Sequence, residues 1–415
     1  MSRLRALAAL VLGLCACEER AARAPAAASA PSALPSPPAA SAGGASAARA
    51  AHSADVSRGK ALVERFECHR CHEGTGLSAL PRERHCVRCH QEIEAGKVPA
   101  PAGKLAEWKQ GVAGVSNVPS LEGLGRLRRE WLEAYLSEPH DLRPALVSTM
   151  PRLAISAEQA ADIVAYLKAR SPALADEAPA RGDAERGRTI ALERGCAGCH
   201  AFSGVAGWPE GRGPGVSVEL APDLRFARER LTAAATAAWL RDPKRLKPAT
   251  LMPDPRLDPS EIADVTAFIQ ETALAPPVAA VPPRLAPLEH PVTFAEVDQK
   301  VFSVTCRHCH SNTETAFGDG GPGFDGGFGF APRRVDLSSH RGLSSGLLLA
   351  DGERHSLFER LPDGTPRLVA TLLARQAEEA GRPSPTLRGM PLGLPALSPE
   401  QIQLVESWVL QGHPL

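Results

Sequence analysis

Apolar residues recur at helical spacing in three stretches of the chain, and each stretch follows a helix-capping residue. Ser156, Asp258 and Ser398 each stand three residues before Glu or Gln, which is the arrangement of a capping box. In two of the three, Pro at the first helical position favours the same start. We therefore predict helices that begin at these residues and bury one face. The apolar positions are Ile163, Tyr166 and Leu167; Ile262, Val265, Phe268 and Ile269; and Ile402, Val405, Trp408 and Val409.

A second set of helices is predicted upstream of these, and two of them share one pattern. Residues 55–62 read DVSRGKAL and residues 183–190 read DAERGRTI, so Asp, Arg and Gly hold the same offsets in both. This match indicates an internal repeat. A third helix starts less regularly, at the capping box formed by Thr293 and Glu296.

Pro- and Ala-rich stretches separate these helical segments. Residues 18–54 are rich in Ala, Pro and Ser and predict a flexible tether, and 171–182 and 275–292 predict shorter linkers. A Gly-rich insertion at 318–331 predicts a mobile loop, with a single calcium-binding repeat as the alternative. The pattern therefore predicts three tandem domains, each opened and closed by a helix. Their bounds are 55–170, 183–272 and 293–415.

Composition narrows the range of partners. The 415-residue length suits roughly two to four domains. The 47 basic and 47 acidic side chains give a formal net charge of +0, so we expect no nucleic-acid partner. Aromatic residues make up only 4% of the chain, which is low for several cores. A bulky apolar cofactor would supply the missing apolar volume.

The chemistry lies in one motif that occurs four times, Cys-x-x-Cys-His. This spacing is the attachment signature of c-type haem, because two thiols on one face of a helical turn add to the porphyrin and the adjoining histidine lies under the iron. Paired zinc sites and disulfides are the alternatives, but neither requires that histidine. We therefore expect four covalent haems c. The cysteines are Cys68, Cys71, Cys86, Cys89, Cys196, Cys199, Cys306 and Cys309, and the iron-binding histidines are His72, His90, His200 and His310.

Three methionines follow a single local pattern. Apart from Met1, the chain contains only Met150, Met252 and Met390, and each is followed by proline. Each lies downstream of an attachment motif in a separate part of the chain. A lone methionine usually fills a core, but this shared pattern favours iron ligation on the far side of the ring, which raises the reduction potential.

The first 17 residues predict an export signal. A basic stretch at 2–5 is followed by a short apolar stretch at 6–14. Leu14 and Ala16 then frame Cys17 as the lipidated residue of a bacterial lipoprotein, with Cys15 as a poorer fit and an ordinary secretory signal as the alternative. We expect an exported protein, periplasmic or outer-membrane-associated, that is anchored to the membrane by lipid at Cys17. No other stretch is long and apolar enough to span a bilayer.

The order of these features resembles small bacterial class I cytochrome c domains: a helix, the attachment motif, a Trp-Leu helix, Met-Pro and a capped terminal helix. The resemblance covers nearly all of 55–415. It implies an all-α fold for the three tandem domains, in which the first and last helices cross beside the ring. Gly59 would face Tyr166 and Gly187 would face Phe268 at the close approach. The third unit departs from the pattern, because Val297 stands at this position opposite Trp408.

One haem is left without methionine. Aligning Trp131 with Trp239 leaves 58 residues after His72 but 38 after His200, and the motif at 86–90 lies in that excess. Its iron takes a histidine or keeps an open position. His140 is the first choice, on the methionine-bearing loop; His52 is second, and His85 is third because it adjoins Cys86.

Two classes of function remain open. Four haems, three of them ligated on both faces, suit an electron carrier between periplasmic or membrane redox partners. An open iron at His90 would instead suit a haem enzyme, such as a peroxidase or another small-molecule oxidoreductase. An electron-input subunit of a larger dehydrogenase is a third reading. No other catalytic constellation occurs in the sequence.

Overall fold

The computed structural model describes residues 53–112, 116–140, 142–144, 150–171, 179–276, 280–312, 314 and 321–415. All of them belong to one compact unit, His52–Leu415. The predicted export signal with Cys15 and Cys17, almost all of the tether, His52, and much of the 171–182 linker lie outside the described residues. Within the described part, no helix combines the length and apolar character needed to cross a bilayer.

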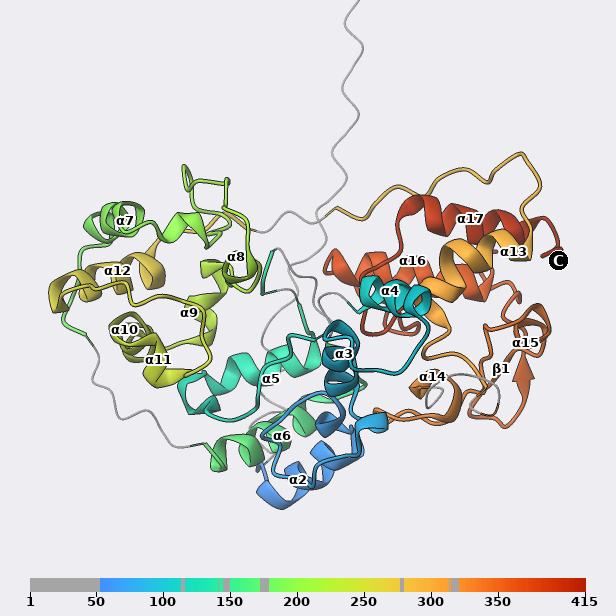
Figure 1. Cartoon of the computed structure of the whole chain (residues 1–415), viewed down its shortest axis with the longest axis horizontal. Coiled ribbons are helices and arrows are strands. Elements are labelled where there is room, and N and C mark those ends of the chain that lie inside the picture. Colours follow the sequence, from blue (N-terminus) through green and yellow to red (C-terminus); the bar gives the residue numbers. More distant parts are fainter. Residues whose placement is uncertain are drawn as a thin grey trace, which may run out of the picture. The chain divides into compact units, whose positions relative to one another are not determined.

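The first helical region (53–171) contains both attachment motifs of the predicted first domain (Figure 1). Its helices are α2 (Val56–Arg65), α3 (Cys86–Glu94), α4 (Ala102–Gly111), α5 (Arg129–Ser137) and α6 (Ala157–Ala169), with short 3-10 turns η1 (Cys68–Arg70), η2 (Arg82–Arg84) and η3 (Leu124–Arg126).

The second helical region (179–276) repeats the same order around a single motif. It contains α7 (Ala184–Glu193), η4 (Cys196–Gly198), α8 (Val216–Glu219), η5 (Leu224–Phe226), α9 (Ala227–Arg230), α10 (Ala233–Arg241), α11 (Pro243–Leu246) and α12 (Pro259–Glu271).

The third helical region (280–415) is longer and less regular. It contains α13 (Phe294–Val297), the π-helix η6 (Asp298–Cys306), α14 (Pro322–Asp325), α15 (His340–Ser344), α16 (Arg367–Glu379) and α17 (Pro399–Leu410). Strands β1 (Leu347–Leu348) and β2 (Arg354–His355) pair antiparallel and form the only sheet among the described residues. The chain is thus mainly helical, as predicted.

The predicted helix starts are confirmed. Ser156, Asp258 and Ser398 each form a complete capping box, in which the side chain and backbone of the cap both bond to the third residue of the helix. Asp55 and Asp183 cap α2 and α7.

Glycine sets the crossing of the first and last helices in the first two regions. A Cβ added at Gly59 would stand 2.0 Å from the Asp162 carbonyl oxygen, and one at Gly187 would stand 2.0 Å from that of Asp264. No side chain fits such a backbone-to-backbone contact. Tyr166 also lies at the first crossing, as predicted, whereas the nearest atoms at the second belong to Asp264 and Val265 rather than to Phe268.

The repeated Asp and Arg secure the same crossing. The Asp55 backbone N–H donates to buried Asp162 at 2.7 Å, and Arg58 pairs with the same carboxylate at 2.9 Å. In the second region Asp183 and Arg186 bind buried Asp264 in the same way, and the guanidinium holds the pKa of Asp264 below its usual value. The offsets shared by the two copies therefore encode one tertiary contact.

The first and last helices of the third region meet without a glycine between them. Val297 and Trp408 are fully buried in its core, and the chain continues from α13 into a π-helix that ends at Cys306. The wider π turn occurs where a side chain replaces the hydrogen of glycine, and π segments are often found at functional positions.

The structure corrects one equivalence within the repeat. The helices α5 and α10 have the same length, and their C-caps, Glu138 and Asp242, each precede proline. Counted from these caps, Tyr135 rather than Trp131 corresponds to Trp239. The excess of residues after His72 therefore grows, and the motif at 86–90 still lies within it.

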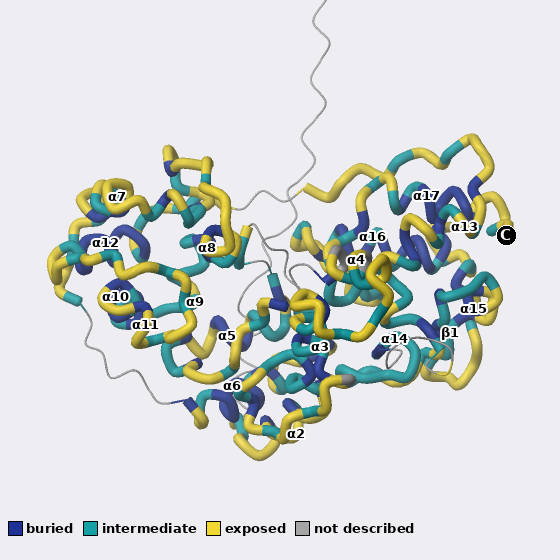
Figure 2. The backbone as a smooth tube through the Cα atoms, viewed as in Figure 1, coloured by how far each residue is buried: buried dark blue, intermediate teal, exposed yellow. Residues whose placement is uncertain are grey.

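Three apolar cores account for most buried side chains, one in each region (Figure 2). The described part of the Gly-rich insertion is not a mobile loop, because Phe328 and Phe330 pack against the core of the first region. The Phe328 backbone N–H also donates to Glu67 at 3.0 Å. The prediction failed because the partner of these aromatic residues is some 260 positions away in sequence.

We predict that Gly187→Ala destabilises the second region by about 1–3 kcal/mol, because the new methyl group forces α7 and α12 apart. Urea unfolding followed by circular dichroism measures the effect. Gly211→Ala is the matched control, since a Cβ there meets nothing within 4 Å. Equal midpoints for the two variants would contradict the tight crossing.

Candidate haem-attachment sites

Each attachment motif places its first cysteine and its histidine on one turn. The backbone N–H of His72, His200 and His310 donates to the carbonyl of the first cysteine of its motif, at 2.9, 2.9 and 3.0 Å. The remaining motif, at 86–90, lies at the start of helix α3, and Cys86 is the first residue of that helix. Residues four apart on a helical turn lie on the same face, so the thiol of the first cysteine and the imidazole of the histidine can bind the same ligand. None of the eight cysteines in the described residues forms a disulfide, and all eight are partly buried.

Two of the histidines are held by the same second interaction. His72 Nδ1 lies 2.8 Å from the Pro119 carbonyl oxygen, and His200 Nδ1 lies 2.8 Å from that of Pro222. Burial lowers the pKa of both rings, which keeps them neutral. With Nδ1–H donating to a carbonyl, Nε2 is left as the metal-binding atom.

The sequence analysis missed these carbonyls, although a signal for them exists. Residues 118–121 read VPSL and 221–224 read APDL, so proline and leucine stand at the same offsets. In both copies the leucine N–H donates to the carbonyl of the residue that follows the motif histidine, at 2.9 Å. The segment is therefore fastened beside the histidine that its proline orients.

His310 has a different setting in the third region. Burial lowers its pKa to about 4, so the ring is neutral at physiological pH. A Cβ at Gly323 would stand 2.3 Å from the ring, so only glycine fits against this imidazole. Leu337 donates to the His310 carbonyl at 2.8 Å, but Val335 replaces the proline of the other two regions.

The motif at 86–90 lies between two others. The Cys86 thiol hydrogen-bonds to the Cys71 thiol and raises the pKa of Cys71. On the other side, the His90 and His308 rings are 6.1 Å apart, and His308 belongs to the motif of the third region. Neighbours of this kind could not be read from the sequence, because they depend on how the regions pack.

The three methionines are placed differently. Met252 Sδ accepts a hydrogen bond from Trp239 Nε1 at 3.0 Å and packs against the second core. Met390 packs against the third core, and its N–H donates to the Thr371 carbonyl. Met150 is partly buried and directly precedes the Pro151–Arg152 segment.

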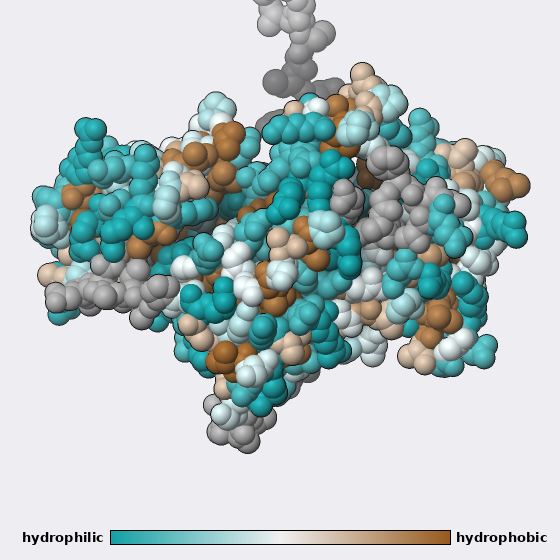
Figure 3. Space-filling model, turned by 60° about the horizontal axis from the view of Figure 1, so that its bottom comes forward, coloured by the Kyte–Doolittle hydropathy of each residue, from teal (hydrophilic) through white to brown (hydrophobic). Residues whose placement is uncertain are grey.

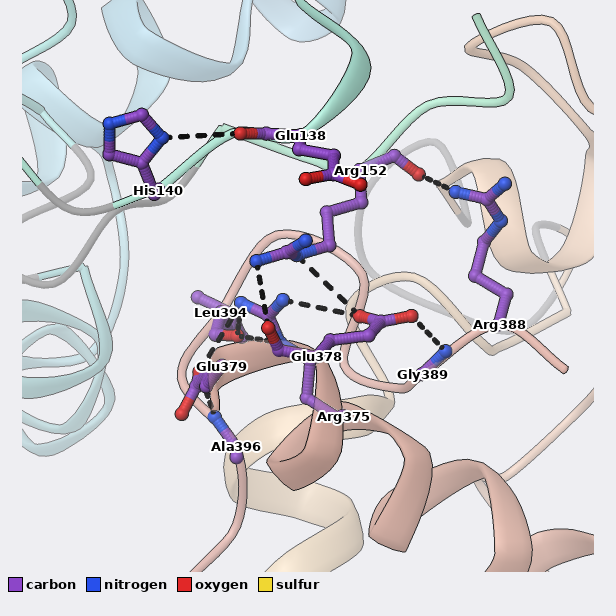
Figure 4. A network of polar contacts seen from close by, with 10 residues as sticks. All are labelled: Glu138, His140, Arg152, Arg375, Glu378, Glu379, Arg388, Gly389, Leu394 and Ala396. Carbon is purple, nitrogen blue, oxygen red and sulfur yellow. Dashed lines mark hydrogen bonds and ion pairs between the residues drawn. The ribbon is translucent and has the colours of Figure 1, made fainter. Parts of the chain in front are cut away.

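The histidines considered for the haem at His90 are also placed. His140 Nδ1 lies 3.3 Å from the Glu138 carbonyl oxygen (Figure 4). The His140 ring contacts Tyr135 and Phe226. Its Nε2 is buried and has no hydrogen-bond partner. His85 is buried, caps α3 through Nδ1, and places Nε2 3.3 Å from Glu73.

Partly buried cations gather where the first and second regions meet. Arg230 Cζ lies 5.3 Å from the Trp131 ring, and Arg126 Cζ lies 5.9 Å from the Trp239 ring, so each region lends an arginine to the other. Burial lowers the pKa of Arg230 to about 10, helped by Arg126 and Arg143. Arg230 Nε and Trp131 Nε1 are buried donors without a hydrogen-bond partner. A cofactor with carboxylate groups, as haem has, fits this donor set.

Apolar side chains are also exposed beside the motifs. Val304 lies two residues before Cys306, Leu251 adjoins Met252, and Leu192 lies four residues before Cys196; their exposed fractions are 65%, 50% and 38%. The face drawn in Figure 3 is mainly hydrophilic, with scattered apolar patches. An apolar ring seated at these positions would cover surface that water otherwise contacts. The residues present therefore fit haem.

Comparison with known proteins identifies the second region. Residues 184–273 match the cytochrome c family model, from the start of α7 to just beyond the end of α12. No curated protein and no solved structure matches the chain. The second region is thus a cytochrome c domain, which implies covalently bound haem c and supports assignment of the chain as a c-type cytochrome.

Proposed function

We propose that the chain is a tetrahaem c-type cytochrome that carries electrons between periplasmic or membrane redox partners. The observation that carries the proposal is the shared proximal geometry of His72 and His200. One of these lies in the recognised cytochrome c domain, and the other lies in the first region. The motifs at 86–90 and 306–310 extend the same donor set to four haems.

The proposal includes three tandem domains with the predicted bounds, 55–170, 183–272 and 293–415. Three apolar cores support it, one for each domain. The same capping box opens the last helix of each.

Met150, Met252 and Met390 are the proposed second ligands of three haems. The Trp239 N–H supports this role for Met252, because it fixes the thioether and leaves a second sulfur lone pair for a metal. When bound, such haems would supply reversible one-electron chemistry at raised potential. The chain's own contribution is to hold both ligands, exclude water and bring the motifs side by side, as at Cys71 and Cys86.

The sixth ligand of the haem at His90 distinguishes an electron carrier from an enzyme. His140 stays the proposed sixth ligand, and its buried Nε2 without a partner suits that role. The same structure also supports the enzyme alternative, because the described contacts of His140 are with Tyr135 and Phe226, and His85 is used as a helix cap. An open iron there would suit a peroxidase or another small-molecule oxidoreductase.

Carbon monoxide binding to the reduced protein distinguishes the two. We expect no rapid, high-affinity binding to the wild type, and reduction of the His90 haem last in a redox titration, because bis-histidine ligation gives a lower potential than His/Met. His140→Ala should open one haem to carbon monoxide, whereas His290→Ala, at an exposed position, should not. Rapid binding by the wild type would favour the enzyme.

We further propose that Cys17 carries a lipid anchor and that the tether lets the haem domains extend from the membrane. A lipid group gives membrane association without a spanning helix. Cys17→Ser should move the protein from the membrane to the soluble fraction, as immunoblotting of the two fractions would detect. If the variant stays with membranes to the same extent as the wild type, lipidation at Cys17 is wrong.

A further inference from the structure

Two methionine-bearing segments, 240 residues apart in sequence, interlock in the structure. The Arg152 backbone N–H, two residues after Met150, donates to the Leu392 carbonyl, two residues after Met390, at 3.3 Å. Arg388 donates in return to the Arg152 carbonyl. The segments thus exchange hydrogen bonds on both sides of Met390, and Arg152, which follows Met150, takes part in each of them.

Glu378, on helix α16, lies between these segments (Figure 4). Its carboxylate accepts the Gly389 N–H at 2.7 Å, one residue before Met390. The other oxygen lies 3.6 Å from Arg152 Nε and 3.4 Å from Arg375 Nη1. Arg152 also donates to the Glu378 backbone carbonyl at 3.3 Å. One side chain therefore contacts both methionine segments.

The burial of the Glu378 carboxylate makes it dependent on its cationic and N–H partners. Glu378 is only 5% exposed, and a buried carboxylate needs cations and N–H donors to offset its lost hydration. Gly389 leaves no room for a side chain, because a Cβ there would stand 2.5 Å from the Arg375 Cα. The segment before Met390 is thus pressed against α16 and bound to Glu378.

We propose that Glu378 is a positioning residue that sets the axial methionines of two haem domains at once, Met150 of the first and Met390 of the third. The inference rests on the proposed methionine ligation. It adds that the two sites are not independent, since the first domain completes its methionine segment only against the third. Met252 lies outside this contact and is an internal reference.

A carboxamide in place of the Glu378 carboxylate should weaken its contact with the two methionine segments while keeping the shape of the side chain. In Glu378→Gln one oxygen can still accept the Gly389 N–H, but the amide NH2 then faces Arg152 and Arg375 instead of an anion. A cavity of about 310 Å³, lined in part by Arg152, Glu378 and Arg388, adjoins the network and leaves open space beside Arg152. The variant should therefore fold with a displaced segment.

The test uses the full-length, haem-loaded protein. The near-infrared charge-transfer band of the oxidised protein and the ligand-methionine methyl resonances of the reduced protein are recorded, with Met150→Ala, Met252→Ala and Met390→Ala assigning each signal. We expect Glu378→Gln to weaken the band by more than Met252→Ala does and to shift the Met150 and Met390 resonances but not that of Met252. Both affected haems should also show shifted reduction potentials.

Glu406→Gln is the matched control, because Glu406 is an equally buried acid of the third region that pairs with Arg284 instead of the methionine segments. It should leave all three resonances in place. Arg152→Gln keeps the Glu378–Gly389 bond and should shift the Met150 resonance, so it serves if Glu378→Gln fails to fold. Unchanged resonances in Glu378→Gln, or a change at Met390 alone, would overturn the inference. A wild type without any methionine signal would instead overturn the ligation itself.

Discussion

The contact that organises the first two regions is the crossing of their first and last helices at Gly59 and Gly187. Backbone meets backbone there, and a carboxylate from the last helix receives the cap and the arginine of the first. This fixes where the first helix ends, and the attachment motif follows directly on its last turn. The positions of the Cys68/Cys71 pair and the Cys196/Cys199 pair are therefore set by a contact that involves no haem.

Much of this could be predicted from the sequence, because the contacts concerned are local or repeated. Capping boxes at Ser156, Asp258 and Ser398 need only four consecutive residues, and the Asp, Arg and Gly offsets occur twice. The crossing at Gly59 and Tyr166 was expected from the resemblance to class I cytochrome c domains.

What escaped prediction involves residues far apart in sequence. The carbonyls that orient His72 and His200 belong to segments 47 and 22 residues downstream, and the apolar pattern of the chain does not predict them. Phe328 and Phe330 seemed part of a loop because their partners lie in another region. The equivalence of Tyr135 with Trp239 became clear only from where α5 and α10 end. In the sequence alone, Trp131 is the more obvious match for Trp239.

We propose that each of the four motifs carries a covalent haem. Intact-mass measurement of the mature protein, made in a host with haem-attachment machinery, tests it directly. We expect the mass of the processed chain plus four haem groups, with every motif cysteine unavailable to a thiol reagent. A fully matured protein with two haems or fewer, and with reactive thiols at the remaining motifs, would contradict the account.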